Sequence, residues 1–574
     1  MLRRRNIIAF IVALITVSCA TVVPPSGGPV DDTPPIPKNI KPENYSRNFT
    51  KKKAVIEFDE FVVLDKLTQQ LVISPEMPEK PDISIRGKKV IIELPDSLDE
   101  NTTYTIFFGN AIVNYKEGLP IANFEYVFST GDEVDSMMIE GTAVRAFDHK
   151  APEGSFVMLY KEQDDSIPYH KRPYYLTKVE KNGHFRLSNL SAGQYKIFAL
   201  QDMNSNYLFD QPIEEIAFID SLITPYPDPH SYGVRDSSDT LEIIPAEPVQ
   251  LYFFTEAVKK QDILASKLLA SNKFEIIFAK PLTSLKMQPL NLKKDTIWNF
   301  NKINKNQDTL TTWLMGVRQD TLLVEVSDEG QVLDTLRFIL HKKKRSSQAA
   351  FKRKKKKNQP AEKPKPKKIP KLAYSDNARG GFPFYSDIHF EFKTPIKEWD
   401  PTKIKILRQR DTIVDTLNAQ AYFTDSVYQM HLVIPTKFKE YKKYGVFIPD
   451  SCFFDIYGVT QDTISKMFVT TEMREYGSLA LTINYPENHP LIVQLLNEKD
   501  NVVFQTIITK SGKIDYPYLK PGKYRLKAIE DENGNGKWDT GDYMQKRQPE
   551  KVFFIKQLIG IRANWDVTQE WIIE

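Results

Sequence analysis

The sequence predicts an all-β protein built as a multidomain string of β-sandwiches, and three observations carry this prediction. At 574 residues the chain is too long for one core and should hold about three to five domains. Its hydrophobic and charged fractions, 41% and 26%, are typical of globular proteins. Short β-type runs separated by turn residues recur along the chain, with no helical stripe between them.

The N-terminal residues predict an export signal and a lipid anchor. Three arginines, Arg3 to Arg5, precede an apolar run over residues 7–17, which is shorter than the about twenty residues of a membrane-spanning helix. The run ends in Thr16-Val17-Ser18-Cys19, which resembles the lipobox of bacterial lipoproteins, although Thr16 replaces the usual leucine. This resemblance implies a signal peptide over residues 1–19 and a diacylglycerol on Cys19. The alternative is that Cys19 is an ordinary signal-peptide residue.

A proline-rich stalk should follow the anchor. Residues 20–37 contain six prolines and two glycines and show no apolar periodicity, so they predict an extended spacer. Cys452 is the other cysteine of the sequence, and lipidation of Cys19 would therefore leave no pair for an intrachain disulfide.

Residues 38–132 predict the first sandwich, with five short β-type runs. Several segments resemble the bacterial Ig-like domain of the S-layer (SbsA) type: Phe58-Asp59-Glu60, Ile73-Ser74-Pro75, Asn101-Thr102-Thr103-Tyr104 and the closing Phe128-Ser129-Thr130-Gly131. A more divergent copy should occupy residues 372–472, where Ile388-His-Phe-Glu-Phe392 opens the domain and Met467-Phe-Val-Thr-Thr471 closes it.

A second repeat links residues 133–244 with residues 473–574. Asn182-Gly183, Leu190, Gly193 and Tyr195 recur as Ser511-Gly512, Leu519, Gly522 and Tyr524, always 329 positions later. A constant offset indicates one structural unit used twice. The pattern Leu-x-x-Gly-x-Tyr resembles the carboxypeptidase regulatory-like (transthyretin-like) sandwich, and this resemblance implies a non-catalytic module.

Two segments between these domains are less specific. Residues 245–341 are strand-rich, with Leu251–Thr255 as one of the runs, and form an unassigned β domain. Residues 342–371 carry fifteen Lys or Arg against the single acid Glu362 and predict a disordered Lys/Pro-rich linker. A solvated spacer is favoured over a ribbon that binds acidic polymers, because Phe351 is the one aromatic residue in it. We therefore expect no nucleic-acid partner.

The best candidate for a ligand site is an Asp/Asn-rich loop near the C-terminus. A calcium loop has oxygen ligands at positions 1, 3, 5, 9 and 12 and a backbone carbonyl at position 7. The matching residues here are Asp531, Asn533, Asn535, Lys537 (backbone), Asp539 and Asp542. Asp542 is shorter than the usual glutamate and should weaken binding.

An earlier copy of this loop keeps Asp202, Asn204, Asn206 and Asp210 but has Ile213 at position 12, so it is a degenerate version. A bound Ca²⁺ would be structural, because it would clamp a loop to its sandwich. The alternative for both loops is an Asx-rich turn whose side chains bond their own backbone. Both interpretations remain open at this point.

Thirteen tripeptides have the form Asp-Ser/Thr-aliphatic, for example Asp308-Thr-Leu and Asp415-Thr-Leu. They resemble the acceptor motif of the general O-glycosylation system of Bacteroidota. The alternative is that Asp-Thr at a turn is a common way to begin a strand. Both interpretations fit an exported β-protein.

The sequence contains none of the enzyme motifs sought. The eight histidines are scattered, with no His-Glu-x-x-His, and there is no Gly-x-Ser-x-Gly. Neighbouring acids such as Asp59 and Glu60 would face opposite sides of a strand. We therefore expect a protein that is not an enzyme and has no small-molecule substrate.

These features together predict a non-catalytic, lipid-anchored outer-membrane protein of a Bacteroidota-like bacterium. It would scaffold or bind proteins, with an outer-membrane protein as its partner and an assembly or export machine as its setting. The alternative is a surface adhesin or glycan-binding lipoprotein. The absence of acids in Ala20–Val23, directly after Cys19, favours the periplasmic face without deciding between the two faces.

Overall fold

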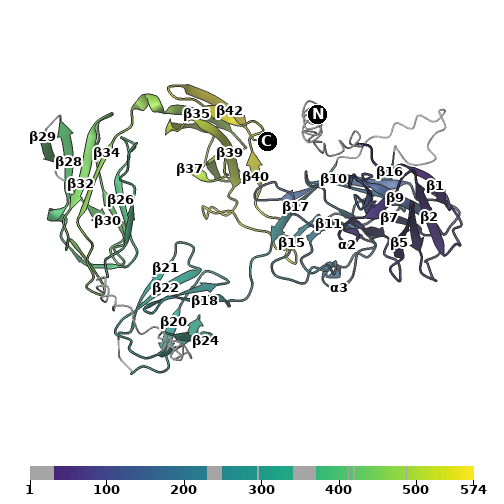
Figure 1. Ribbon diagram of the computed structural model, residues 1–574, viewed down its shortest axis with the longest axis horizontal. Helices are drawn as coiled ribbons and strands as arrows, with labels where there is room; N and C mark the ends of the chain where they lie inside the picture. The colour runs from purple at the N-terminus through teal and green to yellow at the C-terminus, as the bar shows by residue number, and fades with distance from the viewer. Residues whose placement is uncertain are drawn as a thin grey trace, which may run out of the picture. The chain divides into compact units, whose positions relative to one another are not determined.

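The computed structural model describes residues 32–228, 248–293, 297–340, 370–410, 413–417, 420–486 and 488–573. The predicted signal peptide with Cys19, and nearly all of the predicted linker, lie outside these residues. The described part of the chain is built from strands, with two short α-helices, α2 (Leu67–Gln70) and α3 (Ile167–His170) (Figure 1). The all-β prediction is confirmed. None of the described helices is long and apolar enough to cross a membrane.

The described residues divide into two compact units. The first contains the residues up to Glu256 together with Thr540–Pro549, and the second contains Ala257–Asp539 and Glu550–Glu574. Unit 1 is therefore formed by two separate segments of the chain. The shorter segment comes from the middle of the last predicted domain.

The first sandwich of unit 1 has a main sheet ordered β1-β2-β6-β5, faced by β4-β7-β9 and the pair β3-β8. Its aromatic residues Tyr104, Tyr126 and Phe128 are fully buried, so Phe128 of the closing motif is a core residue. The strands are β1 (Pro37–Lys41), β2 (Lys53–Phe58), β3 (Val62–Leu64), β4 (Val72–Ser74), β5 (Asp82–Arg86), β6 (Lys89–Glu93), β7 (Thr103–Gly109), β8 (Ile112–Asn114) and β9 (Phe124–Ser129).

The second sandwich has the strand order β12-β11-β14-β15-β17-β10-β13, with β16 beside β10. Its strands are β10 (Met137–Arg145), β11 (Ser155–Tyr160), β12 (Tyr175–Lys178), β13 (His184–Leu190), β14 (Lys196–Gln201), β15 (Glu215–Phe218), β16 (Tyr226–Pro227) and β17 (Val249–Thr255).

Strand β17 changes the expected boundary at residue 245. It pairs in parallel with β10 and antiparallel with β15, so Leu251–Thr255 complete the second sandwich and do not begin the middle domain. The apolar pattern of this run predicts a strand but not its partner. Parallel pairing joins strands that are distant in the sequence. The apolar pattern of one short segment does not identify such a partner.

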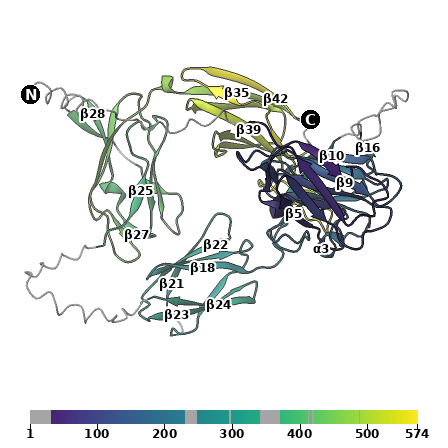
Figure 2. The same ribbon diagram turned by 45° about the vertical axis from the view of Figure 1, so that its right-hand side comes forward.

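The middle domain of unit 2 is a sandwich of the sheets β18-β19-β22-β21 and β20-β23-β24, which Figure 2 shows as two layers. Phe274 of β19 stacks on Phe338 of β24 between them, with ring centroids 4.2 Å apart. The strands are β18 (Ile263–Ala270), β19 (Lys273–Phe278), β20 (Lys286–Pro289), β21 (Asn299–Ile303), β22 (Thr309–Leu314), β23 (Thr321–Asp328) and β24 (Gln331–Ile339).

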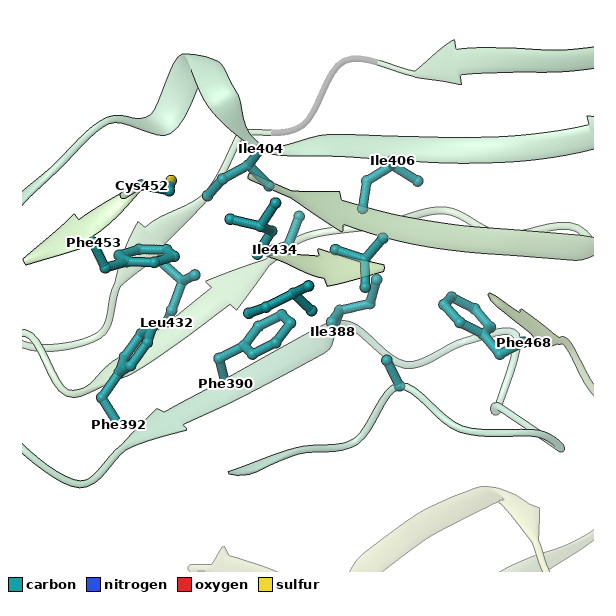
Figure 3. Close-up of a cluster of buried hydrophobic side chains, with 14 of the residues drawn as sticks. Ile388, Phe390, Phe392, Ile404, Ile406, Leu432, Ile434, Cys452, Phe453 and Phe468 are labelled. Carbon is teal, nitrogen blue, oxygen red and sulfur yellow. The ribbon is translucent and has the colours of Figure 1, made fainter. Parts of the chain in front are cut away.

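The fourth sandwich has the sheets β25-β26-β31-β30 and β29-β28-β32-β34, with the pair β27-β33 at its side. Its core holds Ile388, Phe390 and Phe392 of β26 against Ile406 and Phe468 (Figure 3). The strands are β25 (Tyr374–Asp376), β26 (Ile388–Phe392), β27 (Ile396–Trp399), β28 (Lys405–Arg410), β29 (Ile413–Leu417), β30 (Tyr422–Phe423), β31 (His431–Ile434), β32 (Lys443–Ile448), β33 (Phe453–Asp455) and β34 (Ile464–Val469).

Cys452 lies in this core and is 1% exposed (Figure 3). Burial raises the pKa of its thiol to about 11, so the group behaves as a small apolar side chain.

The fifth sandwich repeats the pairing of the second. Strands β35 and β42 are parallel, as β10 and β17 are, and the β36-β39-β40 order matches β11-β14-β15. The strands are β35 (Gly477–Asn484), β36 (Leu491–Asn497), β37 (Val502–Ile508), β38 (Gly512–Leu519), β39 (Gly522–Glu530), β40 (Val552–Phe554), β41 (Ile559–Ile561) and β42 (Asp566–Ile572).

Candidate interaction site

The sheet of β11, β14, β15 and β17 is apolar on both faces. One face contributes Leu159, Ile197 and Phe253 to the sandwich core. The opposite face carries a second cluster of buried rings and aliphatic side chains. We call five of the aromatic residues in this cluster the tyrosine pocket: Tyr160, Tyr169, Phe198, Phe218 and Phe254. An apolar outer face needs a cover, because exposed rings of this area are unfavourable in water.

A ten-residue segment from near the end of the chain, Thr540–Pro549, contributes Tyr543 to this cluster. We call it the clasp. It is a tight turn in which Asp542 and Arg547 exchange two backbone hydrogen bonds, each 2.9 Å long. The Asp542 carboxylate also accepts a hydrogen bond from the backbone N–H of Gln545 at 3.1 Å. The clasp belongs to unit 1, whereas the residues on both sides of it in sequence belong to unit 2.

Tyr543 is the anchor of the clasp. Its ring packs edge-on against Phe218 and Phe198, with centroids 5.0 and 5.3 Å away, and its exposed fraction is 4%. Its hydroxyl donates to the carbonyl of Asp165 at 2.6 Å. Burial raises the pKa of Tyr543 far above its usual value, so the phenol stays neutral and can donate this bond.

Polar contacts surround this ring. The backbone N–H of Tyr543 donates to Glu256 Oε1 at 2.8 Å, and Thr540 Oγ1 donates to the carbonyl of Thr255 at 2.6 Å. Gln548 Nε2 donates to the carbonyl of Phe218 at 3.0 Å. These bonds all go to β15, to β17 or to the residue that follows β17, so they fix the position of the clasp along the sheet.

One carboxylate receives charged partners from both sides. Asp165 pairs with Lys546 of the clasp at 3.1 Å and also with Lys196 of β14. Hydrogen bonds from these two ammonium groups lower the pKa of Asp165. The pair with Lys546 lies at the surface and is therefore weak and sensitive to salt, whereas the Lys196 side chain is largely buried.

Gly541 allows the clasp to approach the sheet closely. A Cβ at this position would lie 2.7 Å from two ring atoms of Phe254 and 2.9 Å from the carbonyl oxygen of Arg547. Such distances are much shorter than a van der Waals contact. No side chain fits here without moving the clasp away from the ring.

The clasp is an insertion relative to the repeat. In the second sandwich, Asp210 is followed after four positions by Glu214, which is fully buried. In the fifth sandwich, Asp539 is followed after eleven positions by Glu550, which is also buried. Each glutamate accepts hydrogen bonds from backbone N–H groups of its own Asx-rich loop. The seven extra residues form most of the clasp.

The register of the strands confirms this alignment. Phe198 pairs with Phe218 in one copy, and Lys527 pairs with Phe554 in the other. The offset between copies is thus 329 residues before the insertion and 336 after it. Sequence reasoning that kept a single offset missed both Glu214 and Glu550, although the change of offset was present in the sequence.

The structure brings the predicted calcium-loop residues of unit 2 together. Asp531 accepts hydrogen bonds from the backbone N–H groups of Asn535 and Gly536, at 3.0 and 2.8 Å. The side-chain amides of Asn533 and Asn535 both donate to Asp539 Oδ2, at 2.5 and 2.6 Å. The backbone N–H of Lys537 donates to Asn535 Oδ1 at 2.7 Å.

Asp542, the predicted ligand at position 12, lies in the clasp and belongs to unit 1, whereas the five other predicted positions belong to unit 2. The earlier loop has the same internal bonding. Asn204 and Asn206 donate to the two oxygens of Asp210, at 3.0 and 2.7 Å, and Asp202 accepts from the N–H groups of Ser205 and Tyr207.

Both loops present hard oxygen donors of the kind that Ca²⁺ prefers. Within the described residues, no group of three or more His, Cys, Asp and Glu side chains is arranged to hold a metal ion. Asparagine amides would therefore have to turn their oxygens inward to complete a site. Calcium binding stays a prediction.

Comparison with known proteins identifies one domain. The bacterial Ig-like domain family matches residues 31–130, which correspond to the first sandwich. The chain is therefore an all-β, multidomain protein that carries a bacterial Ig-like domain near its N-terminus. A search of the curated proteins found no match.

Solved structures give weak overall matches. The S-layer protein SbsC is 9% identical over 91% of this chain and 66% of its own, with a TM-score of 0.14. The MG0-NIE-MG1 domains of Escherichia coli alpha-2-macroglobulin are 12% identical over 52% of this chain and 98% of theirs (TM-score 0.18). The major pilin subunit BcpA of Bacillus cereus is 10% identical over 76% and 99% (TM-score 0.12). This chain spans 66% of the length of the SbsC structure.

Proposed function

We propose that this protein is a non-catalytic scaffold of the bacterial cell envelope, held at the outer membrane by a lipid on Cys19. The observation that carries the scaffolding role is the clasp. A loop extension that one copy of the repeat lacks is used to fill an apolar pocket elsewhere in the same chain. Such a contact holds the clasp on the sheet of unit 1 and leaves the edges of the sandwiches available for partners.

The contacts of the clasp support a permanent structural contact and not a site that binds a ligand. Tyr543 is almost fully buried, its hydroxyl and its N–H are both hydrogen-bonded, and Gly541 permits direct contact with Phe254. Burying one aromatic side chain contributes about 1.5–3 kcal/mol. These contacts hold the clasp against the sheet of unit 1 and favour a structural role for it.

The proposed partner is a β-barrel or another outer-membrane protein. The test is purification of the native chain from its own membrane after mild detergent extraction. Co-purification of an outer-membrane protein with the wild type, and its loss with Tyr543→Ala, is the expected result. A chain that is isolated alone, or whose partner is unaffected by that substitution, would overturn the role given to the clasp.

The anchor is tested separately. Labelled palmitate should be incorporated into the wild type and not into Cys19→Ser. Protease treatment of intact cells then distinguishes the two faces of the membrane. Degradation without permeabilisation would favour the alternative of a surface adhesin, and protection would favour a periplasmic scaffold.

A further inference from the structure

Strand β37 is an edge strand of the fifth sandwich that is exposed on both faces. It is the end strand of the order β37-β36-β39-β40. Val502, Val503, Phe504 and Ile507 have exposed fractions of 50, 41, 38 and 51%. Only Ile508, at the end of the strand, is half-buried against the core.

The sequence of this strand lacks the usual protection of an edge. Natural edge strands carry lysine or proline, or they are short. Residues 501–509, Asn-Val-Val-Phe-Gln-Thr-Ile-Ile-Thr, contain no charge and no proline, although 26% of the chain is charged. The one feature that would hinder pairing at this edge is a register shift between Leu495 and Leu496, which lies opposite the start of β37. Residues 504–508 form a regular ladder beyond it.

The ends of the strand have opposite charges. The turn before β37 contains Glu498, Lys499 and Asp500 and has a net charge of −1, whereas Lys510 and Lys513 follow the strand. Lys510 is exposed, and Asp500 is exposed with a contact to Arg525 at 3.8 Å. An antiparallel copy of the same strand would therefore place each acidic turn beside the basic end of its partner.

We infer that β37 pairs with β37 of a second copy of this chain, antiparallel and about a two-fold axis through Gln505. In this register Val503 lies opposite Ile507 of the partner, Phe504 lies opposite Thr506, and the Asp500 turn lies beside Lys510. The free backbone N–H and C=O groups of both edges pair, and four apolar side chains per copy lose exposed surface. The inference goes beyond the proposed scaffold and depends on neither the lipid nor the clasp.

The first test is the oligomeric state of the full chain in detergent, measured by sedimentation. The wild type should dimerise, and Ile507→Lys should raise the dimer dissociation constant at least tenfold, which is about 1.4 kcal/mol. Leu264→Lys is the matched control, because Leu264 is 67% exposed on β18, the edge strand of another sheet. Circular dichroism confirms that each variant is folded.

The second test uses charge exchange. Asp500→Lys alone and Lys510→Asp alone should each weaken the dimer, because like charges then face each other at both ends. An equimolar mixture of these two variants should recover wild-type affinity, because a heterodimer restores both opposite-charge pairs. A wild type that stays monomeric, a dimer insensitive to Ile507→Lys, or a mixture no tighter than its components would each overturn the inference.

Discussion

The rings of Tyr543 and Phe218 lie 5.0 Å apart between centroids, although more than half of the chain separates them in sequence. One residue belongs to a loop extension of the last repeat, and the other belongs to β15 of the second sandwich. The contact makes unit 1 a product of two distant stretches of chain. The predictions below begin with this contact.

Replacing Tyr543 with alanine should release the clasp. Truncating a buried aromatic side chain typically costs about 3–5 kcal/mol. The basic pair Lys546-Arg547 should then become a rapid site for trypsin, because cleavage requires the segment to leave the sheet. Tyr543→Phe is the control, since it keeps the ring and loses only the bond to Asp165, worth about 1 kcal/mol. Equal trypsin cleavage of the alanine variant and the wild type would contradict this assignment.

Replacing Gly541 with alanine should have a similar effect by steric exclusion. The added methyl group would meet the ring of Phe254 at 2.7 Å, and overpacking of this kind costs about 1–3 kcal/mol. Gly560→Ala is a matched control, because no atom lies within 4 Å of a Cβ at that position. Thermal melts of the two variants should differ clearly. If both melt as the wild type does, the clasp is not held against the ring.

The stability of the fourth sandwich should fall as the pH drops below about 6.5. His389 of β26 stacks on His431 of β31, with ring centroids 5.2 Å apart. Burial and the neighbouring His431 lower the pKa of His389, while Asp387 opposes this shift. The unfolded chain therefore binds a proton more readily than the folded chain does, and stability is present above the unfolded pKa and lost as the pH falls through the folded one.

The check is the melting temperature of the full chain between pH 7.5 and pH 5, conditions that span the ordinary pKa of histidine of about 6.5. His389→Gln should flatten this dependence, whereas His184→Gln, at a half-buried position of β13 outside this sandwich, should leave it unchanged. A wild type with a flat profile would show that the pair tolerates two charges.

Calcium should bind the later Asx loop more tightly than the earlier one. The later loop has Gly536 at the position of the sharp turn, with φ of 75°, whereas Tyr207 adopts φ of 60° at the same position in the earlier loop. Isothermal titration of the full chain with CaCl₂ should give heat that Asp531→Ala abolishes and Asp202→Ala reduces less. No heat from the wild type would leave both loops as self-bonded Asx turns.

Glu550 should matter whether or not calcium binds. It accepts hydrogen bonds from the N–H groups of Glu532 and Asp539, at 2.9 and 2.8 Å, one near each end of the Asx-rich stretch. Glu550→Ala should lower stability by about 1–3 kcal/mol, because two part-buried backbone N–H groups lose their acceptor. The exposed Glu532→Ala serves as the control. Chemical denaturation of both variants gives the comparison.

The sequence predicted the parts of this fold that depend on local pattern. The apolar runs predicted five strands of the first sandwich, β2, β5, β6, β7 and β9, but not the short strands β1, β3, β4 and β8. The constant offset between Tyr195 and Tyr524 predicted the repeat. Partners across large sequence distances were not predictable in this way. The run Leu251–Thr255 was assigned to the middle domain because its alternation says nothing of the parallel partner β10.

The candidate site was missed for a related reason, although it left a signal. The strands around Met158, Phe198 and Phe218 are apolar at consecutive positions, which is typical of a sheet covered on both faces. That pattern indicates that another segment covers the outer face of the sheet, but it does not identify the segment. Only the change of offset between Asp539 and Glu550 pointed to the covering segment.

The position of the clasp in the sequence also determines when unit 1 can finish folding during synthesis. The strands that form the tyrosine pocket are complete by Glu256, but their cover comes almost three hundred residues later. At translation rates of roughly 5–20 residues per second, the pocket waits on the order of tens of seconds for Tyr543. During that interval the rings that Tyr543 contacts, among them Phe198 and Phe218, lack this part of their cover, and the incomplete chain must be shielded by a chaperone or risk aggregation.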